Sequence, residues 1–385
     1  MSFPSSEYTH NMMNFLVAER QALNRFSPGL DDKLAAAGLE RLEAPEGGAI
    51  ELFRQHGGPG LLIPQEYSGL GANAVEAIRY QRALGSRAPS LAVASTMHHF
   101  SVATLVAMCA ASPGMEWLLL AAIAEQQLLV ASGFAEGHSG SNVLRPTMRA
   151  KKVSEGVLVN GSKKPCSLSR SMNLLTASVT IDDDAGGRYA ILLIPAESPG
   201  IERRPFWKNF VLAGAESDEI VLRDVFVPDR LTFRTSEAID TDPTEGTGFL
   251  WFELLISAAY LGVASALAER VVQGDKGSAY DRCSLAVELE GAMAALESQA
   301  QVLMAGTPTR HDFARALFVR FAVQRSIERA TALAAELMGG MAFVQSSEIA
   351  YLYAAARALA FHPPSRLAAS SGLASYVAGA ELRLE

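Results

Sequence analysis

Apolar side chains recur every three or four residues along the first third of the chain, which is the period of one face of an α-helix. Glycine and proline clusters, PEGG at residues 45–48 and HGGPG at residues 56–60, separate these segments and are typical of turns. The pattern therefore predicts a helical domain over residues 1–128. The predicted helices are residues 8–24, 31–42, 73–86, 91–109 and 115–125.

Residues 129–235 change to the alternation of apolar and polar positions that indicates β-strands. Asn160 and Gly161 form a pair that is typical of two-residue hairpin turns, so we expect a turn there and a polar loop over residues 162–170. This region is predicted to be a central β domain, a barrel or a sheet. The predicted strands are residues 147–153, 156–160, 174–181, 189–194 and 219–227.

A polar linker at residues 236–247 leads into long segments rich in alanine and leucine. Thr309 stands where a side chain can cap the start of a helix. Long helices with short connections indicate a four-helix bundle, which gives a third domain over residues 236–385 and an α+β fold overall. The predicted helices are residues 249–273, 281–305, 311–338, 348–361 and 366–380.

Composition limits the classes of function. The net charge of −8 and the lack of a basic stripe argue against a nucleic-acid partner. Residues 249–268 are apolar enough to raise the question of a membrane span, but Glu253 interrupts them and we expect a buried core helix. No secretory signal is visible, and three scattered cysteines fit a reducing compartment, so we expect a cytoplasmic protein.

Residues 136–142 form a loop of small residues, a type of loop that brings backbone N–H groups close to an anion. A phosphate or pyrophosphate group is one expected ligand, and a simple surface turn is the alternative. The spacing GHSGS at residues 137–141 differs from the GxSxG of serine hydrolases, and no long parallel α/β pattern surrounds it. A hydrolase is therefore not favoured.

Several motifs, in the same order along the chain, resemble those of the acyl-CoA dehydrogenase family. Residues 135–142, AEGHSGSN, are similar to the loop that this family usually writes as TEPxxGSD. Residues 160–167, NGSKKPCS, resemble its NGxKxWIT/S, with Pro165 in place of the tryptophan. Residues 62–71, LIPQEYSGLG, are similar to its PEEYGGLG, and residues 336–340, ELMGG, to its QxxGG.

The resemblance implies a fold, a cofactor and a reaction. It implies FAD between the β domain and the bundle, α,β-desaturation of an acyl thioester on CoA or a carrier protein, a flavin electron acceptor or reductase as partner, and a homodimer or homotetramer. It also assigns cofactor-binding roles by position, with the glycine pair meeting the FAD of a neighbouring subunit. The residues so assigned are Phe134, Ala135, Ser141, Ser167, Gly339 and Gly340.

The catalytic glutamate of that family is missing. His362 stands where the family usually has the glutamate, and a histidine could act as the base because its pKa lies near neutrality. Some members carry the glutamate on an earlier helix, at the position of Phe252. Glu253 lies one residue further, about 100° around the helix, and is expected to point elsewhere.

Three functions stay open at this point: desaturation with His362 as base, a flavin monooxygenase of the same fold, and a protein without redox chemistry that acts as a binding partner or a modified lyase. In the monooxygenase, His98, His99 or His138 could handle protons. His98 and His99 lie in an apolar helical pattern, so we expect one of them to be a core histidine with satisfied hydrogen bonds. Lys163 and Lys164 are expected to be solvated side chains of a turn.

Overall fold

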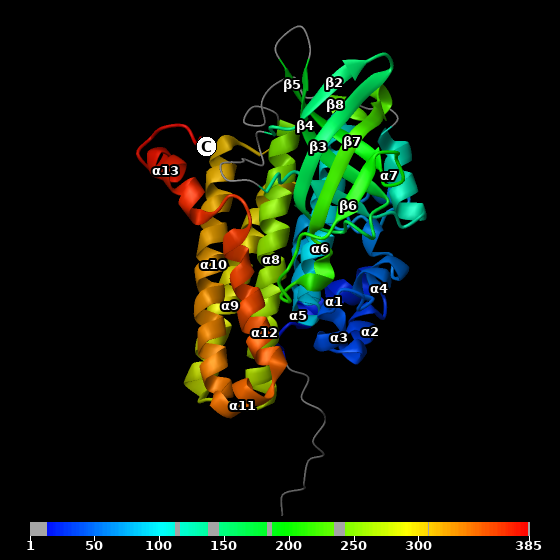
Figure 1. The fold of residues 1–385 in the computed structure, drawn as a ribbon. Helices are drawn as coiled ribbons and strands as arrows, with labels where there is room; N and C mark the ends of the chain where they lie inside the picture. Colours follow the sequence, from blue (N-terminus) through cyan, green and yellow to red (C-terminus); the bar gives the residue numbers. More distant parts are fainter. Residues whose placement is uncertain are drawn as a thin grey trace, which may run out of the picture.

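The computed structural model describes residues 14–111, 116–137, 146–182, 187–234, 243–306 and 308–383. Helices come first, a β-sheet follows, and a second set of helices ends the chain, which confirms the predicted α+β fold (Figure 1). The long C-terminal helices stand beside the sheet, and most of the short N-terminal helices lie at one end of it (Figure 1).

Side-chain caps and glycine conformations determine where some of the N-terminal helices begin and end. Asn73 and Glu76 cap each other's backbone N–H groups at the start of α5, a reciprocal arrangement that satisfies two otherwise unpaired donors. The helix expected over residues 31–42 is broken in two, because Gly38 adopts a φ of 78°. The helices are α1 (Val17–Phe26), α2 (Leu30–Ala37), α3 (Leu39–Glu43), α4 (Ala49–Gln55), α5 (Ala74–Arg87), α6 (Pro89–Ala111) and α7 (Glu116–Glu125), with 3-10 turns η1 (Gly58–Gly60) and η2 (Gln65–Tyr67).

One mixed sheet contains all the described strands. Its order is β6-β7-β3-β2-β4-β5-β8, and β1 pairs in parallel with β4. The β2–β4 pair is also parallel, while the other neighbours are antiparallel. The strands are β1 (Val130–Gly133), β2 (Arg149–Val153), β3 (Gly156–Cys166), β4 (Leu174–Asp182), β5 (Arg188–Pro195), β6 (Ile201–Arg204), β7 (Asp218–Pro228) and β8 (Thr232–Arg234), with 3-10 turns η3 (Ala213–Ala215) and η4 (Asp229–Leu231).

The expectation of a turn at Asn160 and Gly161 is wrong. Strand β3 runs through both residues, and its register against β7 shifts there as in a β-bulge. Gly161 has a φ of 145°, which a glycine adopts without strain. The Asn160 side chain, instead of capping a turn, exchanges two hydrogen bonds of 2.9 Å with the side chain and backbone N–H of Asp224 on β7.

The C-terminal helices follow the predicted pattern closely. Thr309 caps α10 as expected: its hydroxyl accepts from the N–H of Asp312, whose carboxylate in turn accepts from the N–H of Thr309 at 2.8 Å. The predicted helix at residues 348–361 ends in a 3-10 turn. The elements are α8 (Pro243–Gln273), α9 (Ala279–Ala305), α10 (Arg310–Met338), α11 (Gly340–Gln345), α12 (Ser347–Ala356), η5 (Arg357–Phe361) and α13 (Arg366–Val377).

Helix α8 is the element around which the others pack. It contacts α5 and α6 on one side and α9, α10 and α12 on the other. Most side chains of α8 are apolar and buried, as is typical of a helix that is surrounded in this way. Gly85 and Gly262 allow α5 and α8 to touch through their backbones, since a Cβ at Gly85 would lie 2.1 Å from the carbonyl oxygen of Ala259.

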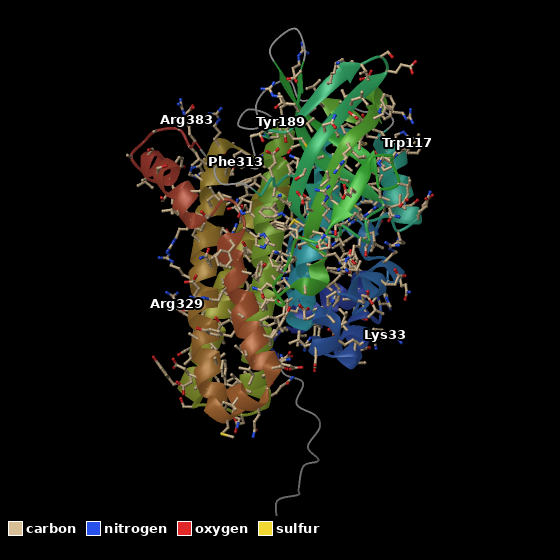
Figure 2. The ribbon with its side chains drawn as sticks, viewed as in Figure 1. Lys33, Trp117, Tyr189, Phe313, Arg329 and Arg383 are labelled. Atoms are coloured by element: carbon tan, nitrogen blue, oxygen red, sulfur yellow. The ribbon has the colours of Figure 1, made fainter. Side chains whose placement is uncertain are left out.

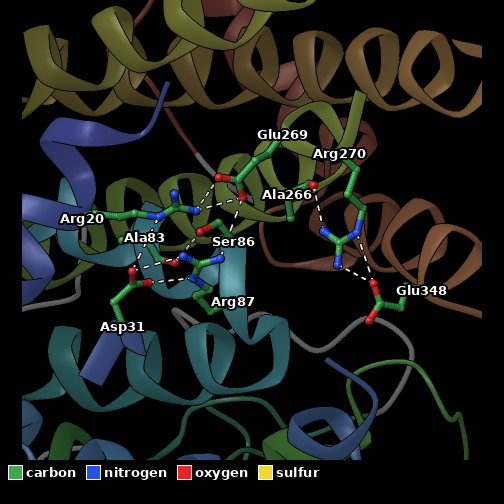
Figure 3. A network of polar contacts seen from close by, with 9 residues as sticks. All are labelled: Arg20, Asp31, Ala83, Ser86, Arg87, Ala266, Glu269, Arg270 and Glu348. Carbon is green, nitrogen blue, oxygen red and sulfur yellow. Dashed lines mark hydrogen bonds and ion pairs between the residues drawn. The ribbon is translucent and has the colours of Figure 1, made fainter. Parts of the chain in front are cut away.

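Charged side chains fix the position of α8 against its neighbours (Figure 3). Glu269 lies 2.7 Å from Arg20, and Arg87 joins Asp31 at 2.7 Å, so α1, α2, α5 and α8 share one polar network. Arg270 binds Glu348 at 2.6 Å and ties α8 to α12. Networks of this kind specify which helix faces meet.

Two helices, Pro89–Ala110 and Gly246–Gln273, are long and apolar enough to cross a membrane by length and composition. Both lie inside the protein instead: 72% of the apolar window of the first and 89% of that of the second are buried. The expectation of a buried core helix at residues 249–268 is confirmed.

Candidate active site

A cavity of about 530 Å³ lies between the sheet and the helices. Tyr189 of β5, which is labelled in Figure 2, is one of the residues that line the cavity. The volume is in the range of small-molecule and cofactor pockets. Most of the lining surface is apolar, which is also typical of such pockets.

The strands and the residues next to their ends contribute small and polar side chains and one phenylalanine to the cavity. Phe134, Ala135 and Ser167, which the sequence singled out, all line it, and their role in cofactor binding stays a prediction. The hydroxyl of Ser167 lies 3.0 Å from that of Ser217, another lining residue. Ser132 adds a third hydroxyl at the end of β1.

The helices contribute a continuous aromatic wall. The Phe100 ring on α6 lies 5.8 Å from Phe134 and 5.5 Å from Phe252 on α8. The Phe252 ring in turn lies 6.2 Å from His362, just after η5, and His362 lies 5.4 Å from Tyr260. The wall is a rigid apolar surface with one polar end.

His362 lies at that polar end, partly buried, and its Nε2 forms a 2.8 Å hydrogen bond with the hydroxyl of Tyr260. Burial, with a further contribution from the charge of Arg320, lowers the pKa of His362 to about 3. Burial raises the pKa of Tyr260 well above its usual range. Both groups are therefore neutral at physiological pH.

Glu253 points away from the cavity, as expected from its position next to Phe252. Its Oε2 lies 2.6 Å from Nη1 of Arg320, and both side chains are only 1% exposed. Arg320 also donates to the carbonyl oxygens of Leu359 and His362, at 2.8 and 3.2 Å. This ion pair therefore holds in place the segment that carries His362.

The expectation that Lys163 is a solvated side chain is wrong. Lys163 is fully buried on β3 and lies 2.9 Å from Glu136. Glu136 also accepts hydrogen bonds from the backbone N–H groups of Thr147 and Met148 at 3.0 Å. Although burial alone would raise the pKa of Glu136, these donors lower it to about 2. Lys164 is half-buried, lines the cavity and is paired with Glu219 at 2.9 Å.

The remaining predicted residues lie elsewhere. Ser141 and His138 fall outside the described residues. Gly339 and Gly340 join α10 to α11, at the far end of the bundle from the sheet (Figure 1). Their predicted contact with the flavin of a neighbouring subunit stays a prediction.

Sequence reasoning missed Tyr260, Ser217 and Phe100. Tyr260 carried a signal, because a tyrosine hydroxyl in an apolar helix needs a buried hydrogen-bond partner. Ser217 and Phe100 had none, since their place in the cavity depends on how the sheet meets the helices.

His98 is the core histidine that the pattern predicted. Its Nδ1 accepts from the N–H of Val130 at 3.0 Å, so its Nε2–H donates to the carbonyl of Pro59 at 2.9 Å. His99 is also fully buried and lies against the rings of Phe53 and Tyr80. Neither histidine lines the cavity.

We predict that His98 makes the protein sensitive to acid. Burial lowers its pKa from 6.5 to about 4, so the unfolded chain binds this proton first as the pH falls. The free energy of unfolding should drop by about 3 kcal/mol between pH 6.5 and pH 4 from this residue. Urea unfolding across this range should give a shallower pH dependence for His98→Gln, and an equal slope in both proteins would contradict the assignment.

We also predict that Ser167→Ala weakens flavin retention. Loss of one hydroxyl at the cavity costs about 1 kcal/mol, or about fivefold in the Kd for flavin. Fluorescence titration of the apoprotein measures this directly. Ser198→Ala, in a turn of the same domain, is the matched control and should bind like wild type; a wild-type Kd for Ser167→Ala would remove the residue from the site.

No protein-family model matches the chain. Isobutylamine N-hydroxylase of Streptomyces viridifaciens is 44% identical over 378 residues, which cover 97% of this chain and 100% of the relative. Mitochondrial isovaleryl-CoA dehydrogenase of Oryza sativa subsp. japonica is 28% identical over 176 residues, 44% of this chain and 41% of the relative. Dibenzothiophene monooxygenase of Rhodococcus erythropolis is 26% identical over 245 residues, 61% of this chain and 58% of the relative.

Solved structures share the fold. KijD3 in complex with FMN and a dTDP-linked amino-keto sugar superposes with a TM-score of 0.83 at 18% identity, over 98% of this chain and 97% of KijD3. FMN-bound TdsC of Paenibacillus sp. A11-2 gives a TM-score of 0.79 at 17% identity, over 96% of this chain and 98% of TdsC.

Proposed function

The chain belongs to the acyl-CoA dehydrogenase family of flavoproteins, and from that premise we propose that it is a flavin-dependent monooxygenase that hydroxylates the nitrogen of an amine. The observation that carries the proposal is the 44% identity to an amine N-hydroxylase over the whole length of that relative. The cavity supports it, since its lining includes Phe252 and His362, the two residues that the motif resemblance aligns with the glutamate positions of the family.

The cavity is poorly equipped for desaturation. None of its described lining residues is an aspartate or a glutamate. Removal of the α proton of a thioester needs a base, and an imidazole whose pKa is about 3 is a weak one. Desaturation of an acyl-CoA or acyl-carrier-protein substrate is therefore less well supported than hydroxylation, which removes no α proton.

The residues of the sheet fit the flavin ring that FAD and FMN share. The hydroxyls of Ser132, Ser167 and Ser217 suit the polar edge of such a ring, and Phe134 and Ala135 suit its apolar face. These residues would hold the cofactor. A bound reduced flavin would supply the two electrons that activate O₂.

The reaction joins one oxygen atom of O₂ to the amine nitrogen and reduces the other to water, consuming two electrons and two protons. The electrons come from a flavin reductase or another flavin electron donor, which is the partner that this chemistry requires. The aromatic wall formed by Phe100, Phe134 and Phe252 excludes water. His362 and Tyr260 orient the amine through hydrogen bonds, with the histidine as a neutral partner rather than a base.

An anaerobic titration tests this function against desaturation. Oxidised holoprotein should keep its visible flavin absorbance when acyl thioesters are added without oxygen. With a reductase and air, isobutylamine should accelerate oxygen uptake. Bleaching by a thioester would establish the dehydrogenase reaction instead, and a protein that takes up no flavin would support the binding role.

Two further features belong to the proposal. A homodimer or homotetramer would cover Met341, Phe343 and Val344 at the end of the bundle, where they are 67%, 47% and 79% exposed. A cytoplasmic location suits the three free cysteines.

A further inference from the structure

The connection between β6 and β7, residues 205–217, lies within the described part of the chain and forms part of the cavity wall. The residues that it contributes are Phe206, Trp207, Leu212 and Ser217. Its one regular element is the 3-10 turn η3, so other parts of the protein must bind much of its backbone. The two ends of η3 are held by different groups.

Leu212 and Glu216, on either side of η3, hold an unfavourable backbone conformation. Their φ angles of 60° and 55° lie in the left-handed region, which costs free energy for residues other than glycine. Both residues are buried. Such a conformation persists only where neighbouring groups fix it. The partners of these two residues therefore decide the shape of the connection.

The end at Glu216 is fixed by the β domain, next to Ser167. Oε2 of Glu216 accepts a hydrogen bond from the N–H of Ser171 at 2.8 Å. Its backbone carbonyl accepts from the hydroxyl of Ser169 at 2.7 Å. Ser217, which follows, shares a 3.0 Å hydrogen bond with Ser167. This half of the connection therefore belongs with the residues proposed to hold the flavin.

The end at Leu212 is held by helices instead. The N–H of Leu212 donates to the hydroxyl of Tyr351 on α12 at 2.9 Å, and that hydroxyl donates to the carboxylate of Glu43 at the end of α3. Glu43 also accepts from the N–H of Ser90 on α6 at 3.1 Å and from its hydroxyl at 2.6 Å. Gly214 of η3 lies directly on this cluster, since a Cβ there would be 3.1 Å from that of Ser90. Three helices thus meet at one buried carboxylate, which fixes Leu212 through Tyr351.

The hold on Leu212 extends to Trp207. The indole N–H of Trp207 donates to the carbonyl oxygen of Val211 at 2.8 Å, and the N–H of Val211 donates to Oδ1 of Asn209 at 3.0 Å. Residues 207–211 therefore form one compact turn that is joined directly to Leu212. A shift of Leu212 would move the indole in the cavity wall.

We propose that Tyr351 and Glu43 are positioning residues that fix residues 205–212 as a wall of the amine subsite. Neither residue lines the cavity, so both act through Leu212. The inference rests on the proposed function, in which the indole of Trp207 offers apolar surface to the alkyl group of the amine. Because the other end of η3 is held separately, loss of this pair should weaken amine binding and spare flavin binding.

Tyr351→Phe keeps the ring and removes the hydroxyl. The N–H of Leu212 is then buried without this acceptor, so the held conformation loses its advantage. With the holoprotein and a flavin reductase, KM for isobutylamine should rise about 5- to 10-fold with a smaller change in kcat, and the Kd for flavin should stay at the wild-type value. Tyr353→Phe, about 200° around the same helix, is the matched control and should behave like wild type.

Glu43→Gln is a second variant, at the other end of the same chain of hydrogen bonds. It should also raise KM, and the double variant Glu43→Gln/Tyr351→Phe should be no worse than the more impaired single variant. Losses that add, or a Kd for flavin that rises by the same factor as KM, would overturn the inference. If Glu43→Gln does not fold, Tyr351→Phe decides alone.

Trp207 reports on the connection without any reaction. In a Trp117→Phe/Trp251→Phe background it is the only tryptophan, and it is 36% exposed. Adding Tyr351→Phe should raise the constant for acrylamide quenching in the flavin-free protein about twofold, while Tyr353→Phe should leave it unchanged. An unchanged constant for Tyr351→Phe would overturn the inference. Failure of the proposed function gives a different result: the wild type forms no hydroxylamine, whatever the quenching shows.

Discussion

His362→Ala should lower kcat/KM for the amine by about 10- to 100-fold and leave the Kd for flavin close to that of wild type. The substitution removes the polar group at the end of the aromatic wall, so the amine nitrogen loses a hydrogen bond worth about 1–3 kcal/mol in a buried site. Steady-state hydroxylamine formation and flavin titration measure the two effects separately.

Tyr260→Phe is the companion variant. It keeps the ring that packs against His362 and removes only the hydroxyl that orients it, so the loss should be smaller than for His362→Ala. If His362→Ala retained wild-type kcat/KM, the histidine would have no role in holding the substrate. If flavin binding fell in parallel with activity, its role would be to shape the cofactor site.

Arg320→Met should destabilise the protein by about 3–5 kcal/mol. The substitution leaves the carboxylate of Glu253 buried without a partner, and it also removes the donor to the carbonyls of Leu359 and His362. Denaturant unfolding measures the loss. Burial already raises the pKa of Glu253, so without Arg320 the deficit should shrink as the pH falls and the carboxyl group takes up a proton.

The double variant Glu253→Met/Arg320→Met separates charge from packing. Replacing both partners removes the unpaired charge, so most of the lost stability should return. A double variant as unstable as Arg320→Met would mean that the bonds to Leu359 and His362, rather than the buried charge, dominate.

The order of helices, sheet and helices could be predicted because long apolar periods and capping residues such as Thr309 act locally. The bulge at Gly161 could not, because the strand is continued by pairing with β7, which lies about 60 residues away in sequence. The wrong expectation for Lys163 had the same cause. A lysine in a turn is solvated, whereas Lys163, buried on a strand, needs the carboxylate of Glu136 to balance its charge. The domain limits at residues 128 and 235 remain a prediction.

The residues of the cavity could be predicted only in part from the sequence. Motif similarity identified Phe134, Ala135, Ser167 and His362, which all line it. Motif similarity could not give the protonation state of His362, because the lowered pKa depends on burial and on the charge of Arg320 from another helix. The exclusion of Glu253 from the cavity, by contrast, followed from helix geometry alone.

Incubation of the holoprotein with a flavin reductase, an alkylamine and ¹⁸O₂ tests the account most directly. Mass spectrometry should find a hydroxylamine with one ¹⁸O atom, formed in proportion to the oxygen consumed. Two results would contradict the proposed hydroxylation: a product whose oxygen comes from water, or conversion of an added acyl thioester to an enoyl thioester by the same protein.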